Sequence, residues 1–228
     1  MKYLIVNGDD FGASRGINRG ILEAHRRGIL TSTSLLVRMP WSEEAAGLSR
    51  ATPDLSVGLH VDLGKELKLT TGSRPWMREE LHRQFTRFQE LTDRRPTHLD
   101  SHHNVHRDPQ VLPLFLELAA EHGLPMREQS PVRYFSKFYG QWGGKTHLEQ
   151  LSVESLTRML ETEINEGFNE LSCHPGYVDP DYPTGYSRER EAELHTLCDP
   201  RVRKALAEQS IHLVSYHDFA GFAAKAPR

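Results

Sequence analysis

The sequence predicts an α/β fold in which about seven parallel strands alternate with helices in a single domain spanning residues 1–228. Apolar runs of strand length alternate with stretches of helical period along the whole chain. This alternation implies parallel strand pairing through right-handed crossovers. No linker or low-complexity tract divides the chain, and 228 residues are enough to bury one sizeable core. By itself, the pattern leaves open whether the sheet is doubly wound or closed into a barrel.

Each element is predicted from its own periodicity and end signals. In the first predicted helix, between Ser14 and Gly28, Ile17, Ile21 and Ala24 fall on one face. The predicted strands are residues 2–6, 31–37, 55–63, 96–101, 125–128, 168–173 and 211–216. The further predicted helices are residues 43–50, 78–92, 109–121 and 153–165, and one within 188–208. Residues 129–146 are aromatic and contain glycine, which predicts a long surface loop of the kind that is often functional.

The composition argues against several classes of partner. The formal net charge is −3 and the basic residues are dispersed, so no basic stripe indicates nucleic-acid binding. No apolar run reaches the ~18 residues that a membrane span needs. The opening "MKYLIVNGDD" turns acidic after a short apolar run, unlike a signal peptide, so we expect a cytoplasmic protein. In that compartment Cys173 and Cys198 are expected to be reduced.

The stretch "VNGDDFG" (residues 6–12) places two carboxylates, Asp9 and Asp10, directly after an apolar run. Like charges repel, so such a pair calls for a nearby cation that holds one of them ionised. Successive side chains of a strand point to opposite faces, so the two can share a site only if the strand has ended between them. The alternative is a strand end followed by an Asx turn, with Gly12 supplying the bend.

Further metal-ligating side chains also follow predicted strands. These are His60, four histidines with Asp100 in "HLDSHHNVH" (98–106), and His174. The carboxyl ends of parallel strands meet at one side of the fold, so we expect them to converge there. A catalytic metal site usually has three protein ligands, so some of these histidines must do other work, such as orienting a ligand. For any single histidine, the alternative is a solvent-facing or hydrogen-bonded residue.

Four motifs, "NGDDFG", "GLHVDL", "THLDSHHNVH" and "CHPGY", occur in this order along the chain. Together they resemble the YdjC/ChbG family of carbohydrate deacetylases, which remove acetyl groups from N-acetylated sugars such as chitooligosaccharides. The resemblance extends from residue 1 to about residue 216. It implies a distorted TIM-like (β/α) barrel, related to that of the NodB-type polysaccharide deacetylases, and so favours the barrel over the open sheet.

The resemblance also implies roles for five residues. Asp10, His60 and His102 would hold a divalent metal ion, Mg or Zn. Asp9 would be the general base and His174 the acid. The expected substrate is an N-acetylglucosamine-type oligosaccharide such as diacetylchitobiose. Two departures bear on the substrate: "HHN" (102–104) stands where we associate three consecutive histidines with the chitooligosaccharide enzymes, and the segment after Leu63 is shorter.

Aromatic residues in the predicted loops are candidates for a sugar-binding wall, or alternatively pack within their own loops. They are Tyr139, Trp142 and Tyr177, with Phe138 beside them. The substrate is the expected partner, and a homodimer is left open. One rival function is a phosphoesterase or another barrel metallohydrolase, but no Gly-rich phosphate cradle follows a strand. The other is a non-catalytic metal- or sugar-binding protein, which would have no need of the second carboxylate, Asp9.

Overall fold

A mostly parallel sheet forms the centre of the computed structural model, which describes residues 1–64, 73–180 and 182–223. Its strands pair in the order β4-β3-β2-β1-β8-β5, and β9 pairs with β1 beside that path. The seven strands are β1 (Lys2–Phe11), β2 (Ser32–Leu35), β3 (Ser56–Val61), β4 (Leu99–Ser101), β5 (Arg133–Phe135), β8 (Gly167–Cys173) and β9 (Ile211–Leu213). All of these pairings are parallel, as the alternating sequence pattern predicted.

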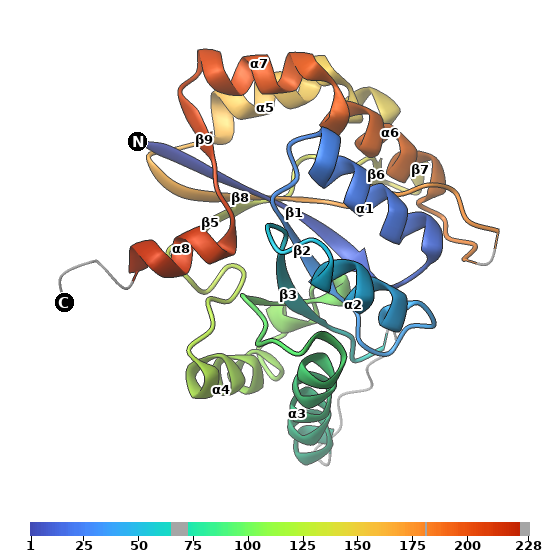
Figure 1. Ribbon diagram of the computed structural model, residues 1–228, viewed down its shortest axis with the longest axis vertical. Coiled ribbons are helices and arrows are strands. Elements are labelled where there is room, and N and C mark those ends of the chain that lie inside the picture. The colour runs from blue at the N-terminus through green and yellow to red at the C-terminus, as the bar shows by residue number, and fades with distance from the viewer. Residues whose placement is uncertain (65–72, 181, 224–228) are drawn as a thin grey trace.

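Helices surround the strands, and the sheet curls into a half-barrel (Figure 1). The helices are α1 (Arg15–Arg27), α2 (Ser42–Arg50), α3 (Ser73–Thr92), α4 (Leu112–His122), α5 (Val153–Glu163), α6 (Ser187–Cys198), α7 (Pro200–Glu208) and α8 (Tyr216–Ala223). Two short 3-10 helices, η1 (His102–Arg107) and η2 (Leu148–Leu151), join them. Among the described residues the edge strands β4 and β5 do not pair. The predicted distorted TIM-like barrel is therefore confirmed in an incompletely closed form.

Helix α1 shows how local sequence signals set the elements. The Ser14 side chain accepts a hydrogen bond from the Ile17 N–H, which satisfies one of the free donors at the helix start. Gly28 follows the last turn, where three basic side chains lie near the negative end of the helix dipole. Ile17, Ile21 and Ala24 are buried in the core, as their spacing predicted.

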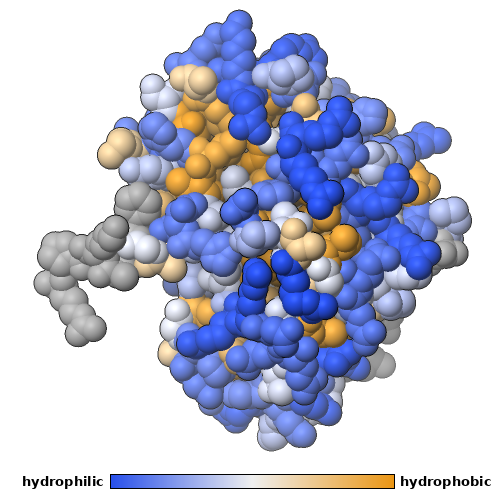
Figure 2. All heavy atoms as spheres, viewed as in Figure 1, coloured by the Kyte–Doolittle hydropathy of each residue, from blue (hydrophilic) through white to orange (hydrophobic). Residues whose placement is uncertain are grey.

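On the face shown in Figure 2, the helices present mostly hydrophilic residues to solvent, and apolar residues gather mainly below α5 and α7 in this view. No helix in the described part of the chain combines the length and apolar character needed to cross a bilayer.

Three predictions on the carboxyl-terminal half were wrong. Residues 125–128 form no strand: Met126 makes one isolated bridge to Leu99, and Glu128 has φ 63°, which ends extended backbone. The missing strand is β5, inside the predicted loop 129–146, which also contains the hairpin of β6 (Gln141–Trp142) and β7 (Lys145–Thr146). The single helix predicted within 188–208 is two helices, because Pro200 starts α7 with Asp199 as its cap.

The last predicted strand ends early, at Leu213, and α8 follows it. Helix α3 begins at Ser73, five residues before its predicted start. Most of the shortened segment after Leu63 lies outside the described residues, so its effect on the cleft stays a prediction.

The strand that carries the acid pair does not end between Asp9 and Asp10, contrary to the prediction. β1 continues through Phe11, but its register with β2 shifts between Gly8 and Phe11. Within this irregularity Asp10 has φ 72°, a left-handed conformation that is uncommon outside glycine. Such irregularities re-aim side chains, so a bulge does what the predicted strand end was expected to do. Both Asp9 and Asp10 consequently face the same cavity.

Candidate active site

A cavity of about 770 Å³ opens at the carboxyl ends of the strands. It is lined by all five polar residues that the sequence singled out for chemistry: Asp9, Asp10, His60, His102 and His174. The convergence follows from topology, because these residues lie at or directly after the carboxyl ends of β1, β3, β4 and β8. Its other charged lining residue is Arg190, which comes from α6.

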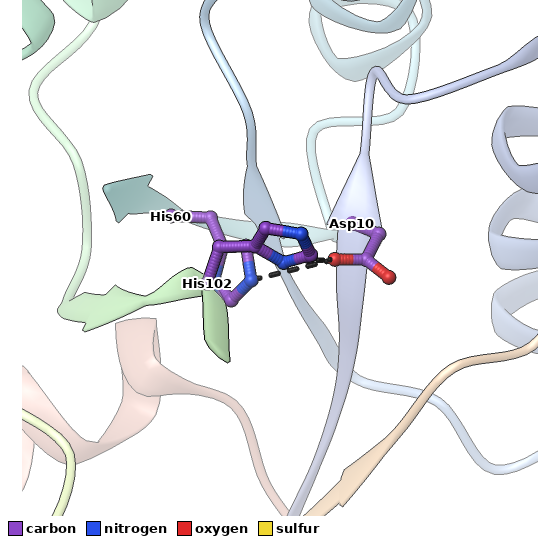
Figure 3. Close-up of side chains that lie close together, drawn as sticks. All are labelled: Asp10, His60 and His102. Atoms are coloured by element: carbon purple, nitrogen blue, oxygen red, sulfur yellow. Dashed lines mark ion pairs between the residues drawn. The ribbon is translucent and has the colours of Figure 1, made fainter. Parts of the chain in front are cut away.

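Asp10, His60 and His102 form a group suited to a metal ion (Figure 3). Their ligand atoms lie within 4.8 Å of one another. Asp10 Oδ1 is 3.1 Å from His102 Nδ1 and 3.4 Å from His60 Nε2. This oxygen is buried and has no hydrogen-bond partner among the described residues. A buried acceptor facing two imidazole nitrogens fits a divalent cation, for which carboxylate and imidazole are ordinary ligands.

His60 is held in place from behind by Asp100. Its Nδ1 lies 2.7 Å from Asp100 Oδ1, which leaves Nε2 directed at Asp10. His98 lies farther from this carboxylate, with its Nε2 4.0 Å from Asp100 Oδ2. Burial alone would lower the pKa of His60, yet the neighbouring carboxylates of Asp100 and Asp10 outweigh it and raise the pKa to about 10.

Two arginines provide the positive charge that the acid pair requires. The buried Arg127 guanidinium donates to Asp9 Oδ2 at 2.7 Å and to Asp9 Oδ1 at 2.8 Å. Burial would raise the pKa of Asp9, but Arg127 outweighs this and holds it below the usual value. Arg190 donates to Asp10 Oδ2 and so leaves Oδ1 free for the histidine side of the group. Asp10 likewise has a lowered pKa, because Arg190 and the two histidines outweigh burial.

Arg127 also explains why a second cluster, Asp9, His60 and Asp100, is a poorer metal site. Its guanidinium forms an ion pair with Asp100 at 2.9 Å while it holds Asp9. Both carboxylates therefore already have a cationic partner. Arg127 contacts a third buried acid, Glu170, through Nε at 2.9 Å and Nη2 at 2.7 Å.

Sequence reasoning missed both arginines. Arg127 lies in a short stretch predicted as a strand, and Arg190 in a helix rich in charges. The one sequence signal that could have pointed to these arginines was the acid pair, which requires a nearby cation.

His174 lies near Asp9, the second member of the acid pair. Its Nε2 is 4.0 Å from Asp9 Oδ2, and its Nδ1 is 3.8 Å from Oε1 of the buried Glu193. The Glu193 carboxylate also accepts the backbone N–H of His174, which fixes the start of the loop after β8. Burial would lower the pKa of His174, but Glu193 and the acid pair outweigh it and raise the pKa. The imidazole is therefore biased toward its protonated form.

The loop that carries His174 packs closely against α1. A Cβ added to Gly20 would lie 2.5 Å from the Gly176 Cα. Only glycine permits this approach of backbone to backbone, which fixes the loop after β8 relative to β1 and its acid pair.

The structure does not bring the three candidate sugar-binding aromatics together. Tyr139 lines the cavity, and so does the buried Phe138. Trp142 lies outside the lining, stacked on His147 with ring centroids 3.7 Å apart. Tyr177 also lies outside it, and its hydroxyl donates to Glu23 of α1. The aromatic side of the cavity is completed by residues that sequence reasoning did not select: Tyr134, Tyr182 and Tyr186.

The remaining histidines of the 98–106 segment differ in their surroundings. His98 is buried and stacks on Tyr216 with a centroid distance of 4.0 Å. His106 is buried between Ser101, at 2.6 Å, and Glu128, at 3.0 Å. His103 lines the cavity with its ring 3.8 Å from that of His102. His103 and Asn104 both have positive φ, which marks the turn after His102 as strained backbone beside the site.

A parallel half-barrel with a carboxylate–histidine group and a buried acid at its carboxyl face is the architecture of a barrel hydrolase. The chain belongs to the YdjC-like protein family, whose family model matches residues 3–208. It is 34% identical to a carbohydrate deacetylase of Geobacillus stearothermophilus, over 96% of this chain and 98% of that protein. It is 36% identical to a chitooligosaccharide deacetylase of Serratia marcescens, over 95% of this chain and 99% of that protein.

Solved structures share the fold. A putative cellobiose-phosphate cleavage protein of Enterococcus faecalis is similar with a TM-score of 0.78 and 27% identity, over 96% of this chain and 98% of that one. A family 4 carbohydrate esterase of Streptomyces lividans matches with a TM-score of 0.59 over 93% of this chain and 91% of that one. At 16% identity the latter supports the fold alone.

Proposed function

We propose that this protein is a metal-dependent carbohydrate N-deacetylase that releases acetate from N-acetylated sugars and leaves a free amino sugar. The observation that carries the proposal is the meeting, in one cavity, of the Asp10–His60–His102 group with Asp9 and His174. The names of the two curated relatives support the same activity. N-acetylglucosamine oligomers such as diacetylchitobiose are the substrates we propose to test first.

A divalent cation, Mg or Zn, would be held by Asp10, His60 and His102. When bound, such a cation polarises the acetamide carbonyl and makes water a stronger nucleophile at neutral pH. The chain's own residues then have two proton transfers to perform, one from the attacking water and one to the departing amine.

Asp9 takes the proton of the attacking water. Because Arg127 lowers its pKa, the carboxylate is ionised throughout the neutral range and is always available as an acceptor. The two hydrogen bonds from Arg127, at 2.7 and 2.8 Å, fix the plane of the carboxylate, so little reorganisation is needed when the proton arrives.

His174 gives its Nε2 proton to the sugar nitrogen, because an amine leaves only when it is protonated. Its raised pKa keeps that proton in place until the C–N bond breaks. His174 Nε2 and Asp9 Oδ2 are 4.0 Å apart, so the acid and the base lie at the same part of the cavity.

The assay that tests the proposal measures acetate release from N-acetylglucosamine oligomers and phosphate release from generic phosphate esters in parallel. We expect acetate alone. Among the cavity-lining residues, the one arginine, Arg190, is already paired with Asp10, which leaves little to hold a phosphate. Phosphate release would favour a phosphoesterase, and tight sugar binding with no product would favour a non-catalytic protein.

Chelator treatment is expected to abolish acetate release, and added divalent metal to restore it. The reason is that the buried Asp10 Oδ1, which has no hydrogen-bond partner among the described residues, faces the two histidines in the geometry of a metal-ligand group. Metal content is measured alongside the rate. Full activity in a sample shown to be metal-free would overturn the assignment of this group.

Tyr139→Ala is expected to raise KM by about three- to tenfold, on the order of one lost aromatic contact, with a smaller change in kcat. Tyr139 lines the cavity and is 39% exposed, so it can stack against a sugar ring. Trp142→Ala is the matched comparison from the neighbouring hairpin, outside the lining, and should change KM less. A larger effect at Trp142 would place the sugar on the hairpin instead.

A further inference from the structure

We propose that Tyr186 is a positioning residue that joins the loop carrying Tyr139 to the acid His174 through Glu193. This inference rests on the proposed function, in which His174 donates the proton. Tyr186 lies directly before α6 and lines the cavity, yet it is only 7% exposed.

The ring of Tyr186 contacts both Tyr139 and the acid His174, which also contact each other. It stacks against Tyr139, with centroids 4.7 Å apart and planes within 8°. The His174 ring meets it edge-on, with centroids 5.6 Å apart and planes at 69°. A change in the position of the Tyr186 ring would therefore affect both the cavity-lining Tyr139 and the acid His174.

The hydroxyl of Tyr186 makes two hydrogen bonds in opposite directions. It accepts the backbone N–H of Gly140 at 2.8 Å, next to Tyr139, and it donates to Glu193 Oε1 at 2.6 Å. Burial and the Glu193 carboxylate raise the pKa of Tyr186, so the hydroxyl keeps its proton and acts as the donor. The loop and the carboxylate are thereby held by one oxygen atom.

Gly140 makes this link tight. A Cβ at this position would lie 2.6 Å from Leu151 Cδ1 and 3.0 Å from Glu189 Cγ, so a larger residue would have to displace these two side chains.

Glu193 is shared between the tyrosine and the acid. Its Oε1, which accepts from Tyr186, is 3.8 Å from His174 Nδ1, and that nitrogen is buried without a hydrogen-bond partner among the described residues. The Tyr186 proton partly satisfies the carboxylate and keeps it from a direct bond to Nδ1. Tyr186 therefore moderates how strongly Glu193 stabilises the imidazolium, which sets how readily His174 gives up its proton.

Other charged and titratable groups also face His174. They are Asp9 and Asp10 from β1, Arg190 and Glu193 from α6, and Tyr139 and Tyr186 from the loop and the start of α6. Removing the Tyr186 hydroxyl removes none of the charged groups, so a change in the titration of His174 reports on the two hydrogen bonds of that hydroxyl, of which only the one to Glu193 reaches a charged neighbour of His174.

The test is Tyr186→Phe, which keeps the ring and removes the oxygen. Without its donor, Glu193 Oε1 interacts more strongly with His174, so the NMR titration midpoint of the His174 imidazole should rise by about half to one pH unit. The signal is assigned by its absence in His174→Gln. Activity requires protonated His174 and is lost as pH rises through the His174 pKa. The alkaline limb of the pH–rate profile should therefore shift to higher pH as well. The Gly140 N–H loses its acceptor, so the loop that carries Tyr139 should be held less firmly and KM should rise by about two- to tenfold.

Tyr177→Phe is the titration control, because its hydroxyl also donates to a glutamate, Glu23, but lies outside the cavity. It should leave the His174 midpoint unchanged. A midpoint in Tyr186→Phe that is unchanged or lower, in protein that unfolds at the wild-type temperature, would overturn the proposal. The titration needs no turnover, so a wild-type protein that releases no acetate would contradict the proposed function while the link through Tyr186 is still tested.

Discussion

Asp9→Asn is expected to lower kcat for acetate release by about 10²-fold or more while the protein keeps its metal, because a general base usually contributes on that scale. Asparagine has nearly the shape of the carboxylate and keeps one acceptor oxygen toward Arg127, but it cannot take a proton from water. Asp9 makes its closest contacts with Arg127 rather than with the histidines, so the Asp10–His60–His102 group is not disturbed.

The matched variant is Asp10→Asn, one residue along the same strand. Its oxygen Oδ1 is the one shared by His60 and His102, so this change should remove metal and activity together. Metal content and kcat are measured for both variants. Equal metal loss in the two would refute the division of roles between base and ligand.

Arg127→Met is expected to reduce the free energy of unfolding at pH 7 by about 3–5 kcal/mol, the usual cost of leaving buried charges without their partner. Arg127 is 1% exposed and contacts three buried acids, Asp9, Asp100 and Glu170. Methionine fills much of the same volume but supplies no charge. Denaturant unfolding measures the loss, and a loss under 1 kcal/mol would show that the acids are neutral in the folded protein.

The loss of unfolding free energy in Arg127→Met should depend on pH. In the wild type, Arg127 outweighs burial and holds the pKa values of Asp9 and Asp100 below those of the unfolded chain. Their contribution to stability is therefore present above the unfolded pKa of about 4 and is lost as pH falls through the lowered values. In Arg127→Met, burial raises these pKa values, so the acids take up protons more easily and the deficit should be smaller at about pH 5 than at pH 7.

Arg107→Met is the control for the effect of losing an arginine. Arg107 binds Glu128 through two hydrogen bonds, at 2.8 and 3.0 Å, but its side chain is 47% exposed. An exposed pair of this kind contributes about 1 kcal/mol or less, because solvent screens it. A loss as large as that of Arg127→Met would mean that burial is not the source of the effect.

Most of the architecture, and the convergence of the candidate metal and proton-transfer residues, could be predicted from the sequence. Apolar runs and capping residues such as Ser14 are local signals, so the alternation of strands and helices could be read from them. The convergence of Asp9, His60 and His174 followed from a rule of topology, that parallel strands end at one face. Where local signals were short, as at residues 125–128 or across Asp199 and Pro200, the boundaries were wrong.

The groups that neutralise and orient the acid pair and the histidines could be identified from the tertiary structure alone. Arg127 lies 118 residues from Asp9 and Arg190 lies 180 residues from Asp10, and in sequence each looks like any solvated arginine. The bulge that turns Asp10 into the cavity depends on the pairing of β1 with β2, which no local pattern encodes. Tyr186 was likewise invisible, because its role comes from where Gly140 and Glu193 lie in space. Strand ends are a property of the chain, whereas the partners of a buried charge are a property of the packed fold.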